Sequence, residues 1–244
     1  MIVRVRCYHN MKAERSHDPV DLLLEHITQA TPDDLDELAR MQETVAGLVV
    51  EQPLGKAPEY ICGVDVSYSG DEFVASAIVM DASDGSIREE NHIKGVARFP
   101  YISGFFAYRE VGALFDAVRG LQKSPDLVFC DGNGKLHPRR CGVACYLGIL
   151  LRMPVIGISK KPPKGVSSEK LSAERGSSIR INGSGIGDGI ALRSQTDTKP
   201  IYASVGNMIS IECIIDLTLS QCIYRIPEPI RKADQESRAR ISGH

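Results

Sequence analysis

The spacing of hydrophobic positions divides the chain into segments with different predicted structures. Residues 1–30 show no sustained period, which indicates a variable N-terminal extension. A helix is then predicted from residue 31 to about residue 51, because Thr31 and Pro32 suit a helix start. Its apolar residues recur at helical spacing: Leu35, Leu38, Met41, Val45, Leu48 and Val49.

A β-rich region follows this helix. Strands are predicted at about 61–68, 73–80 and 93–99, where β-branched and aromatic residues are frequent. Short turns rich in Ser, Gly and Asp separate them, at 69–71 and 81–85. Consecutive strands joined by short turns pair antiparallel, so the pattern predicts a three-stranded meander.

Beyond residue 107 helical and strand patterns alternate, which predicts parallel βαβ strands. The fold class expected is therefore α/β, with a central mixed sheet (an antiparallel three-strand meander followed by parallel βαβ strands) flanked by helices. We expect residues 31–233 to form a single domain and residues 234–244 to be a polar, partly frayed tail. The predicted elements of this half are helices at 107–122, 139–151 and 210–222 and strands at 127–131, 154–159 and 201–204.

Composition narrows the class of protein. The chain has 244 residues, 43% hydrophobic and 25% charged, which is typical of a globular protein and excludes a disordered or fibrous one. Its longest apolar stretch, 142–151, is too short to cross a bilayer, and residues 1–30 lack the pattern of a secretory signal, so we expect a cytoplasmic protein. The net charge of −2 gives no global attraction to nucleic acid, so such a partner would need a local basic patch. Nothing indicates an oligomer, and a monomer is the default expectation.

Three carboxylates occupy positions at which a folded core alone does not require a charged residue. Asp65 interrupts an apolar strand, and a buried carboxylate is costly unless it is paired or binds a cation. Asp131 ends the strand 127–131, at the edge where open α/β sheets place ligands. Glu110 lies in the first turn of its helix. Each of these residues alone could be explained by a salt bridge or by its place at a helix start. The three together support the hypothesis of a cation-binding site.

The chemistry of this trio favours a hard metal ion. Carboxylate oxygens without Cys or His partners suit Mg²⁺ or Mn²⁺, and such sites usually act on phosphates. Basic residues that follow two of the strands could neutralise phosphate charge, although each one alone is more simply a solvated loop residue: Lys135, His137, Arg139, Arg140, Lys160, Lys161 and Lys164.

Several ordered motifs carry a family resemblance over about residues 34–233. They are Gly63-Val-Asp-Val-Ser-Tyr68, Phe99-Pro-Tyr-Ile-Ser-Gly-Phe105 with Tyr108-Arg-Glu110, Asp131-Gly-Asn-Gly-Lys-Leu-His-Pro-Arg-Arg140, Pro154-Val-Ile-Gly-Ile-Ser-Lys160, Ala191-Leu-Arg193, Pro200-Ile-Tyr-Ala-Ser-Val-Gly206 and Arg225-Ile-Pro-Glu-Pro-Ile-Arg231. With these motifs the sequence resembles the endonuclease V family, nucleases that act beside deaminated purine bases.

The resemblance implies a ribonuclease H-like fold and Mg²⁺-dependent DNA repair, with Mn²⁺ as a possible substitute. The expected reaction is hydrolysis of the phosphodiester one bond removed on the 3′ side of deoxyinosine. The family pattern implies that Asp65, Glu110 and Asp131 hold the metal and that Lys160 lies near the scissile phosphate. Tyr101 matches the wedge residue that fills the gap left by a displaced base. Other positions match the surroundings of the base pocket: Gly104, Gly132, His137, Arg139 and Gly142.

Two departures from the family pattern leave alternatives open. Members often have His where this chain has Tyr146, and commonly have Gly-His where it has Gly206-Asn207. Asn207 could still offer an oxygen to a cation but cannot carry a proton, so weaker binding of a second metal is expected. The alternatives are an endoribonuclease specific for inosine and a non-catalytic protein that binds inosine or branched nucleic acid.

Overall fold

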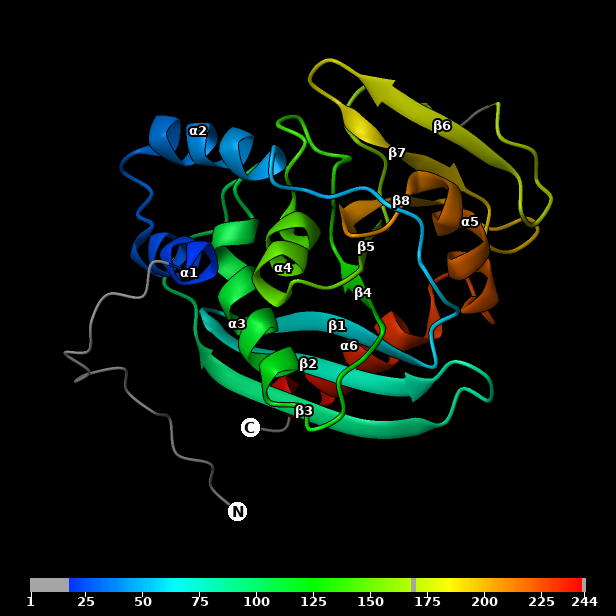
Figure 1. The fold of residues 1–244 in the computed structure, drawn as a ribbon, viewed down its shortest axis with the longest axis horizontal. Helices are drawn as coiled ribbons and strands as arrows, with labels where there is room; N and C mark the ends of the chain where they lie inside the picture. The colour runs from blue at the N-terminus through cyan, green and yellow to red at the C-terminus, as the bar shows by residue number, and fades with distance from the viewer. Residues whose placement is uncertain (1–17, 168–169, 243–244) are drawn as a thin grey trace.

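A single mixed sheet organises the molecule (Figure 1). The computed structural model describes residues 18–167 and 170–242. Within them the strand order is β3-β2-β1-β4-β5-β8-β7-β6. The strands are β1 (Tyr60–Ser69), β2 (Glu72–Asp81), β3 (Ile87–Val96), β4 (Leu127–Asp131), β5 (Val155–Ser159), β6 (Ser178–Gly183), β7 (Gly187–Leu192) and β8 (Ile201–Asn207).

The strand pairings confirm the predicted sheet. Strands β1, β2 and β3 form the antiparallel meander, and β1, β4 and β5 run parallel to one another. Strand β8 then pairs antiparallel with β5, and β7 and β6 extend the sheet antiparallel beyond it. The parallel strands are joined through helices, as a βαβ connection requires.

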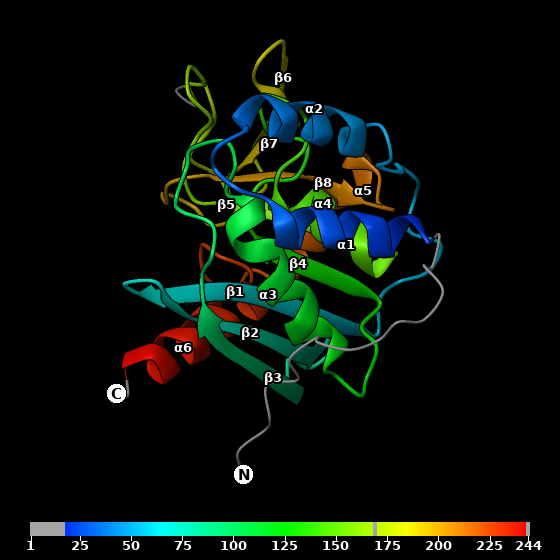
Figure 2. The same cartoon turned by 90° about the vertical axis from the view of Figure 1, so that its left-hand side faces the viewer.

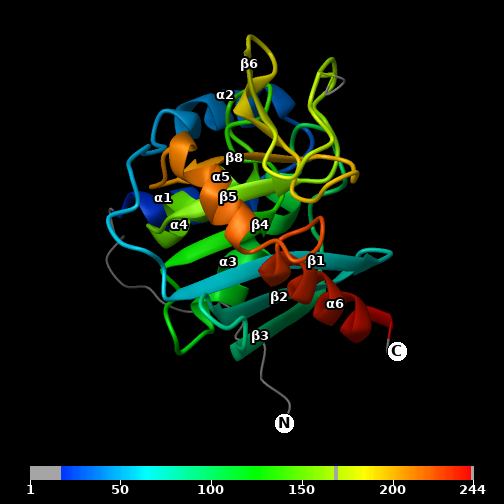
Figure 3. The same cartoon turned by 90° about the vertical axis from the view of Figure 1, so that its right-hand side faces the viewer.

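Helices cover both faces of the sheet. Four lie on one face (Figure 2): α1 (Pro19–Gln29), α2 (Leu35–Ala46), α3 (Ala107–Arg119) and α4 (Val143–Leu151). The opposite face carries α5 (Ile211–Ser220) and α6 (Glu228–Ser242) (Figure 3). Because side chains alternate along a strand, Cys62, Val64 and Cys130 point to the first face, while Ile61 and Phe129 point to the second. No helix in the described part of the chain is long and apolar enough to cross a membrane.

The N-terminal region is more ordered than its sequence pattern predicts. Helix α1 begins after Asp18, whose carboxylate accepts a hydrogen bond from Val20 N, and its Leu23 and Ile27 are buried. The lack of hydrophobic periodicity did not predict this helix at residues 19–29, because two buried positions are enough to pack a short helix against the core. Residues 1–17 lie outside the described part. Helix α2 begins later than predicted because Asp34 caps it, accepting a bond from Glu37 N at 2.9 Å.

The C-terminal segment forms a long helix, and the prediction of a frayed tail from residue 234 is wrong. Helix α6 packs against β1 and β2, with Ile230, Ala233 and Ser237 fully buried. A Cβ atom placed on Gly63 of β1 would lie 2.0 Å from the carbonyl carbon of Pro229. Gly63 therefore permits the backbones of α6 and β1 to approach closely, which brings α6 over the strand that carries Asp65.

Candidate active site

Three aspartates meet where β1, β4 and α6 adjoin. In the parallel register of β1 and β4, Val64 pairs with Cys130, which places Asp65 and Asp131 next to each other. Both side chains point to the face covered by α6, and α6 contributes Asp234. One carboxylate oxygen from each of the three residues lies within 4.8 Å of the other two. Two of the three acids were predicted from the sequence, and Asp234 was not.

The aspartates line a cavity of about 570 Å³. Glu110 enters it from the first turn of α3 and Lys160 from the residue after β5. Asp65 and Glu110 are 7% and 4% exposed, respectively. The structure thus brings the predicted residues Asp65, Glu110, Asp131 and Lys160 to one cavity, with Glu110 beside the tight group of three aspartates.

Asp65 is held by α6. The Ser237 hydroxyl donates a hydrogen bond to Asp65 Oδ2 at 2.7 Å, and the hydroxyls of Ser237 and Ser67 are also 2.7 Å apart. Burial and the negative charge of Asp131 raise the pKa of Asp65 to about 7, although the bond from Ser237 acts in the opposite direction. A carboxylate in this position favours a positive charge beside it.

Glu110, like Asp65, is a carboxylate buried beside another negative charge. Burial raises its pKa well above the ordinary value, and the negative charge of Asp65 adds to the effect. Two cations of the described residues contact the acids of this cavity: Lys160 Nζ lies 2.5 Å from Asp131 Oδ2, and Arg238 Nε donates to Asp234 Oδ1 at 2.9 Å. Burial has the largest single effect on the pKa of Lys160 and lowers it, but the charge of Asp131, the hydrogen bond to Asp131 and the charges of Asp65 and Asp234 together raise that pKa.

The donor set fits a hard divalent cation. It consists of carboxylate oxygens, which Mg²⁺ and Mn²⁺ prefer, and it contains no thiolate or imidazole. A divalent cation among these acids would also offset the repulsion that raises the pKa values of Asp65 and Glu110. Asp65, Asp131 and Asp234 would hold it, with Glu110 close by.

Tyr101 lies at the rim of this cavity. Its side chain is 72% exposed, and its ring contacts that of Phe106 at a centroid distance of 5.6 Å. Phe106 lines the cavity itself. An exposed ring on such a support is suitable for insertion between bases, as predicted for a wedge.

Gly104, His137 and Arg139 gather beside this rim. Arg139 Nη2 donates to the carbonyl of Gly104 at 2.6 Å, and its guanidinium lies 4.4 Å from the centre of the Phe105 ring. His137 is buried, and desolvation and the charge of Arg139 lower its pKa to about 4. Gly104 has φ +83°, which favours glycine. Gln42 of α2 completes the cluster by donating to the Gly104 carbonyl and accepting from Arg139 Nε.

Gly132 and Gly142 are required by close packing of the chain itself. A Cβ atom on Gly132 would lie 2.2 Å from Cγ1 of Val143, and one on Gly142 would lie 2.1 Å from the carbonyl oxygen of Asn133. These contacts fix the loop between β4 and α4. The role of both glycines at a base pocket stays a prediction.

Asn207 lies outside the acid site, contrary to the expectation that it could influence metal binding. It pairs with Val155, the first residue of β5, whereas Lys160 follows the last residue of that strand. Its amide accepts a bond from Val50 N and donates one to the carbonyl of Gly148, both at 3.0 Å. Tyr146 is likewise a core residue, and its hydroxyl bonds that of Tyr108 at 2.8 Å.

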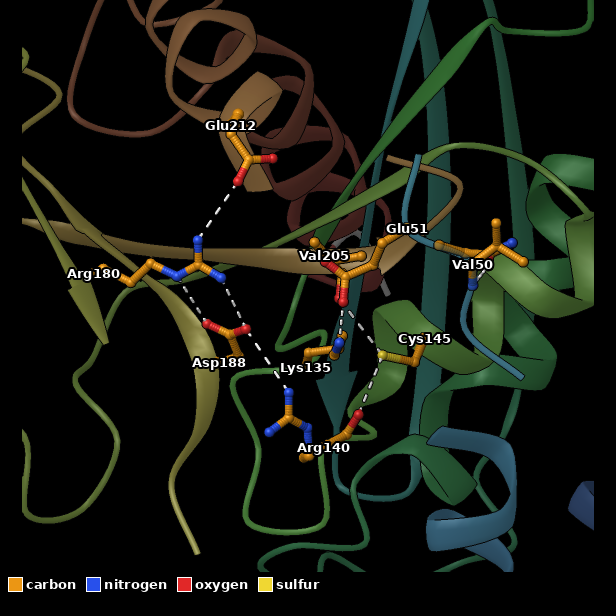
Figure 4. Close-up of polar contacts among 10 residues, drawn as sticks. Val50, Glu51, Lys135, Arg140, Cys145, Arg180, Asp188, Val205 and Glu212 are labelled. Carbon is orange, nitrogen blue, oxygen red and sulfur yellow. Dashed lines mark hydrogen bonds and ion pairs between the residues drawn. The ribbon is translucent and has the colours of Figure 1, made fainter. Parts of the chain in front are cut away.

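Two of the basic residues after Asp131 form ion pairs elsewhere (Figure 4). Lys135 pairs with Glu51, and Arg140 lies 3.8 Å from Asp188 of β7. Asp188 also pairs with Arg180. Neither Lys135 nor Arg140 lines the acid cavity, so their role in neutralising phosphate charge stays a prediction.

Comparison with known proteins agrees with this arrangement. The model of the family described as Endonuclease V matches residues 43–235. The chain belongs to the endonuclease V family. An endonuclease V from Nostoc punctiforme is 36% identical over 214 residues, which cover 86% of this chain and 96% of the relative. The resemblance seen in the motifs is therefore confirmed, and with it the prediction of a nuclease that hydrolyses phosphodiester bonds.

Solved endonuclease V structures share the fold and confirm the predicted α/β class. The Streptomyces avermitilis protein is 36% identical, with a TM-score of 0.79, over 85% of this chain and 93% of that one. The Ciona intestinalis protein, solved with a 24-nucleotide DNA containing an inosine followed by a ribo-adenosine, is 25% identical, with a TM-score of 0.77, over 86% of this chain and 98% of that one.

The residues of this site that the sequence did not predict include Arg238, Gln42, Asp234 and Ser237. The available signal for the last two was the spacing of Ile230, Ala233 and Ser237, which places one face of a helix toward the sheet. Gln42 carried no signal, because its partners Gly104 and Arg139 are far away in sequence.

Proposed function

We propose that this endonuclease V cleaves DNA at the phosphodiester one bond removed on the 3′ side of deoxyinosine, as a step in DNA repair. The observation that carries the proposal is the group of Asp65, Asp131 and Asp234, whose oxygens lie within 4.8 Å of one another beside Glu110 and Lys160. The relative from Ciona intestinalis, crystallised with inosine-containing DNA, supports the choice of substrate.

Mg²⁺ is the proposed cofactor, with Mn²⁺ as a substitute. A divalent cation bound by the aspartates would polarise the phosphate and lower the pKa of an attacking water. Asp65 and Asp131 are the proposed principal ligands, since they come from adjacent strands and are fixed by the sheet. Glu110, which is buried and lines the same cavity, is proposed as a further ligand of the cation.

Lys160 is the proposed charge-neutralising group. Its ammonium, held at 2.5 Å from Asp131, can contact the non-bridging oxygens of the scissile phosphate and reduce the charge that develops during displacement. Tyr101, which lies against Phe106, would fill the space of the displaced base, and the cluster of Gly104, His137 and Arg139 would contact that base. Gly132 and Gly142 would shape the adjoining loop.

Cleavage of end-labelled oligonucleotides tests this function. Single-stranded DNA and RNA, each with one inosine or a matched guanosine, are incubated with Mg²⁺, Mn²⁺ or EDTA and wild type or Asp131→Asn. We expect an inosine-dependent cut that EDTA and the substitution abolish. Cleavage of the RNA in preference to the DNA would favour the endoribonuclease alternative. Binding without cleavage in either metal would favour a recognition protein, although Asn207 and Tyr146, which prompted that alternative, lie away from the acids.

The protein is proposed to act as a monomer in the cytoplasm. Size-exclusion chromatography with light scattering and cell fractionation test these two predictions.

A further inference from the structure

Two aromatic side chains are exposed among the Phe and Tyr residues that the structure describes. One is Tyr101, and the other is Tyr224, which is 59% exposed in the connection between α5 and α6 (Figure 3). Aromatic rings stabilise a fold mainly when they are buried. An exposed ring at Tyr224 therefore adds little to the stability of this fold. Its surroundings indicate a role.

The backbone around Tyr224 is tied to the acid site. The guanidinium of Arg225 donates to three carbonyl oxygens, those of Lys160 at 2.7 Å, Lys199 at 2.8 Å and Pro200 at 2.9 Å. Lys160 in turn contacts Asp131. The backbone carbonyls on either side of Tyr224 are also bonded, as Gln195 Nε2 donates to Ile223 O and the Ser194 hydroxyl to Arg225 O. Tyr224 therefore carries an exposed ring on a backbone that is fixed on both sides, and its neighbour Arg225 bonds to the Lys160 carbonyl.

A cation supports the ring. The guanidinium carbon of Arg231 lies 5.0 Å from the centre of the Tyr224 ring, and two bonds to Glu228, at 2.6 and 2.7 Å, hold that guanidinium in place. Arg231 precedes Asp234 by about one turn of α6. Arg231 thus connects the Tyr224 ring to the helix that contributes Asp234 to the acid site.

We propose that Tyr224, supported by Arg231, stacks on a base of the substrate strand on the 3′ side of the cleaved bond. Proteins that hold single strands combine cationic grooves with aromatic rings on which bases stack. Tyr101 and the base pocket lie on the Phe106 side of the acids, and the displaced base is 5′ of the cut. Tyr224 is instead connected to the acids through Arg225 and Lys160, so we assign its ring to the nucleotides 3′ of the cut. This inference rests on the proposed function.

Equilibrium binding in EDTA, which prevents cleavage, tests the proposal. The probes are fluorescent single-stranded DNAs with one inosine, either intact or with an abasic site at one of the first three nucleotides 3′ of the scissile bond. The variants are Tyr224→Ala, Tyr224→Phe, which keeps the ring, and Leu22→Ala, an exposed apolar residue on α1 that serves as a control.

Tyr224→Ala should weaken binding of the intact strand roughly 10- to 100-fold, whereas the other two variants should bind like wild type. One abasic site should weaken wild type to the same extent and remove the difference between wild type and Tyr224→Ala. Unchanged binding by Tyr224→Ala, or an equal loss on intact and all abasic strands, would overturn the proposal.

A matched guanosine strand separates the stacking proposal for Tyr224 from the proposed cleavage beside deoxyinosine. Stacking does not depend on the base that is displaced, so Tyr224→Ala should also weaken binding of this strand. If wild type neither prefers inosine nor cleaves beside it, the proposed function fails, while the effect of Tyr224→Ala on the guanosine strand still decides the stacking proposal.

Discussion

The hydroxyl of Ser237 donates a hydrogen bond to Asp65 Oδ2 at 2.7 Å across a sequence separation of 172 residues. This bond connects the last helix of the fold to its first strand. The bond orients Asp65, which was predicted from the sequence as a site residue, through Ser237, which was not.

Ser237→Ala should weaken the affinity for divalent cation roughly 10- to 100-fold, because the bond orients a carboxylate that would bind the metal. The measurement is the Mg²⁺ concentration for half-maximal cleavage. At saturating Mg²⁺ most of the activity should return. Ser220→Ala, at the exposed end of α5, is the matched control. An unchanged Mg²⁺ requirement in Ser237→Ala would show that the bond does not orient a ligand.

Asp234→Asn should reduce cleavage by more than Ser237→Ala does, since it removes a proposed metal ligand and not a residue that orients one. In EDTA its free energy of unfolding should stay within about 1 kcal/mol of that of wild type, because the relief of repulsion among three carboxylates is offset by the loss of the exposed ion pair between Asp234 and Arg238. Single-turnover cleavage and denaturant unfolding measure the two effects, with Asp216→Asn on the exposed side of α5 as the control. Wild-type cleavage by Asp234→Asn would exclude it as a ligand.

Tyr101→Ala should weaken binding of inosine-containing strands roughly 10-fold or more while leaving thermal unfolding unchanged, because the ring is exposed and supports little of the core. Tyr101→Phe should retain binding. Fluorescence anisotropy and calorimetry are the measurements. Equal affinity of Tyr101→Ala and wild type would remove the wedge assignment.

His137 should make the protein less stable in acid. Its pKa is about 4 in the folded state and about 6.5 as a free group, so the unfolded chain takes up the proton first as the pH falls. The stability present above pH 6.5 is lost between about pH 6.5 and 4, and the full loss is about 3 kcal/mol. Denaturant unfolding across this range should show a shallower pH dependence for His137→Gln. Identical slopes for the two proteins would contradict the burial of a neutral His137.

Gly63→Ala should displace α6, because the added Cβ would lie 2.0 Å from the backbone of Pro229. We expect a loss of about 3 kcal/mol or more in the free energy of unfolding, together with loss of cleavage. Gly112→Ala in α3 is the contrasting control, since a Cβ there meets nothing within 4 Å and should stabilise the helix by up to about 1 kcal/mol. Full activity of Gly63→Ala would show that α6 need not approach β1 so closely.

Local patterns in the sequence were sufficient for the sheet and for much of the site. The meander and the parallel strands follow from short turns and from the alternation of strand and helix patterns. Asp65 and Asp131 stand out because each places a charge in an otherwise apolar strand, and the ordered motifs around them identified the family. These signals lie within a few residues of the positions that they concern.

Only the tertiary structure decided which side chains complete the site and which do not. Helix α6 buries small residues, because Gly63 lets it lie directly on β1, so its sequence has few large apolar positions and reads as a polar tail. Its docking brings Asp234 and Ser237 to Asp65. Conversely, Asn207 is held by the backbone at the far end of β5, away from Lys160. Contacts between residues so far apart in the chain depend on how helices and strands pack, which no local period in the sequence encodes.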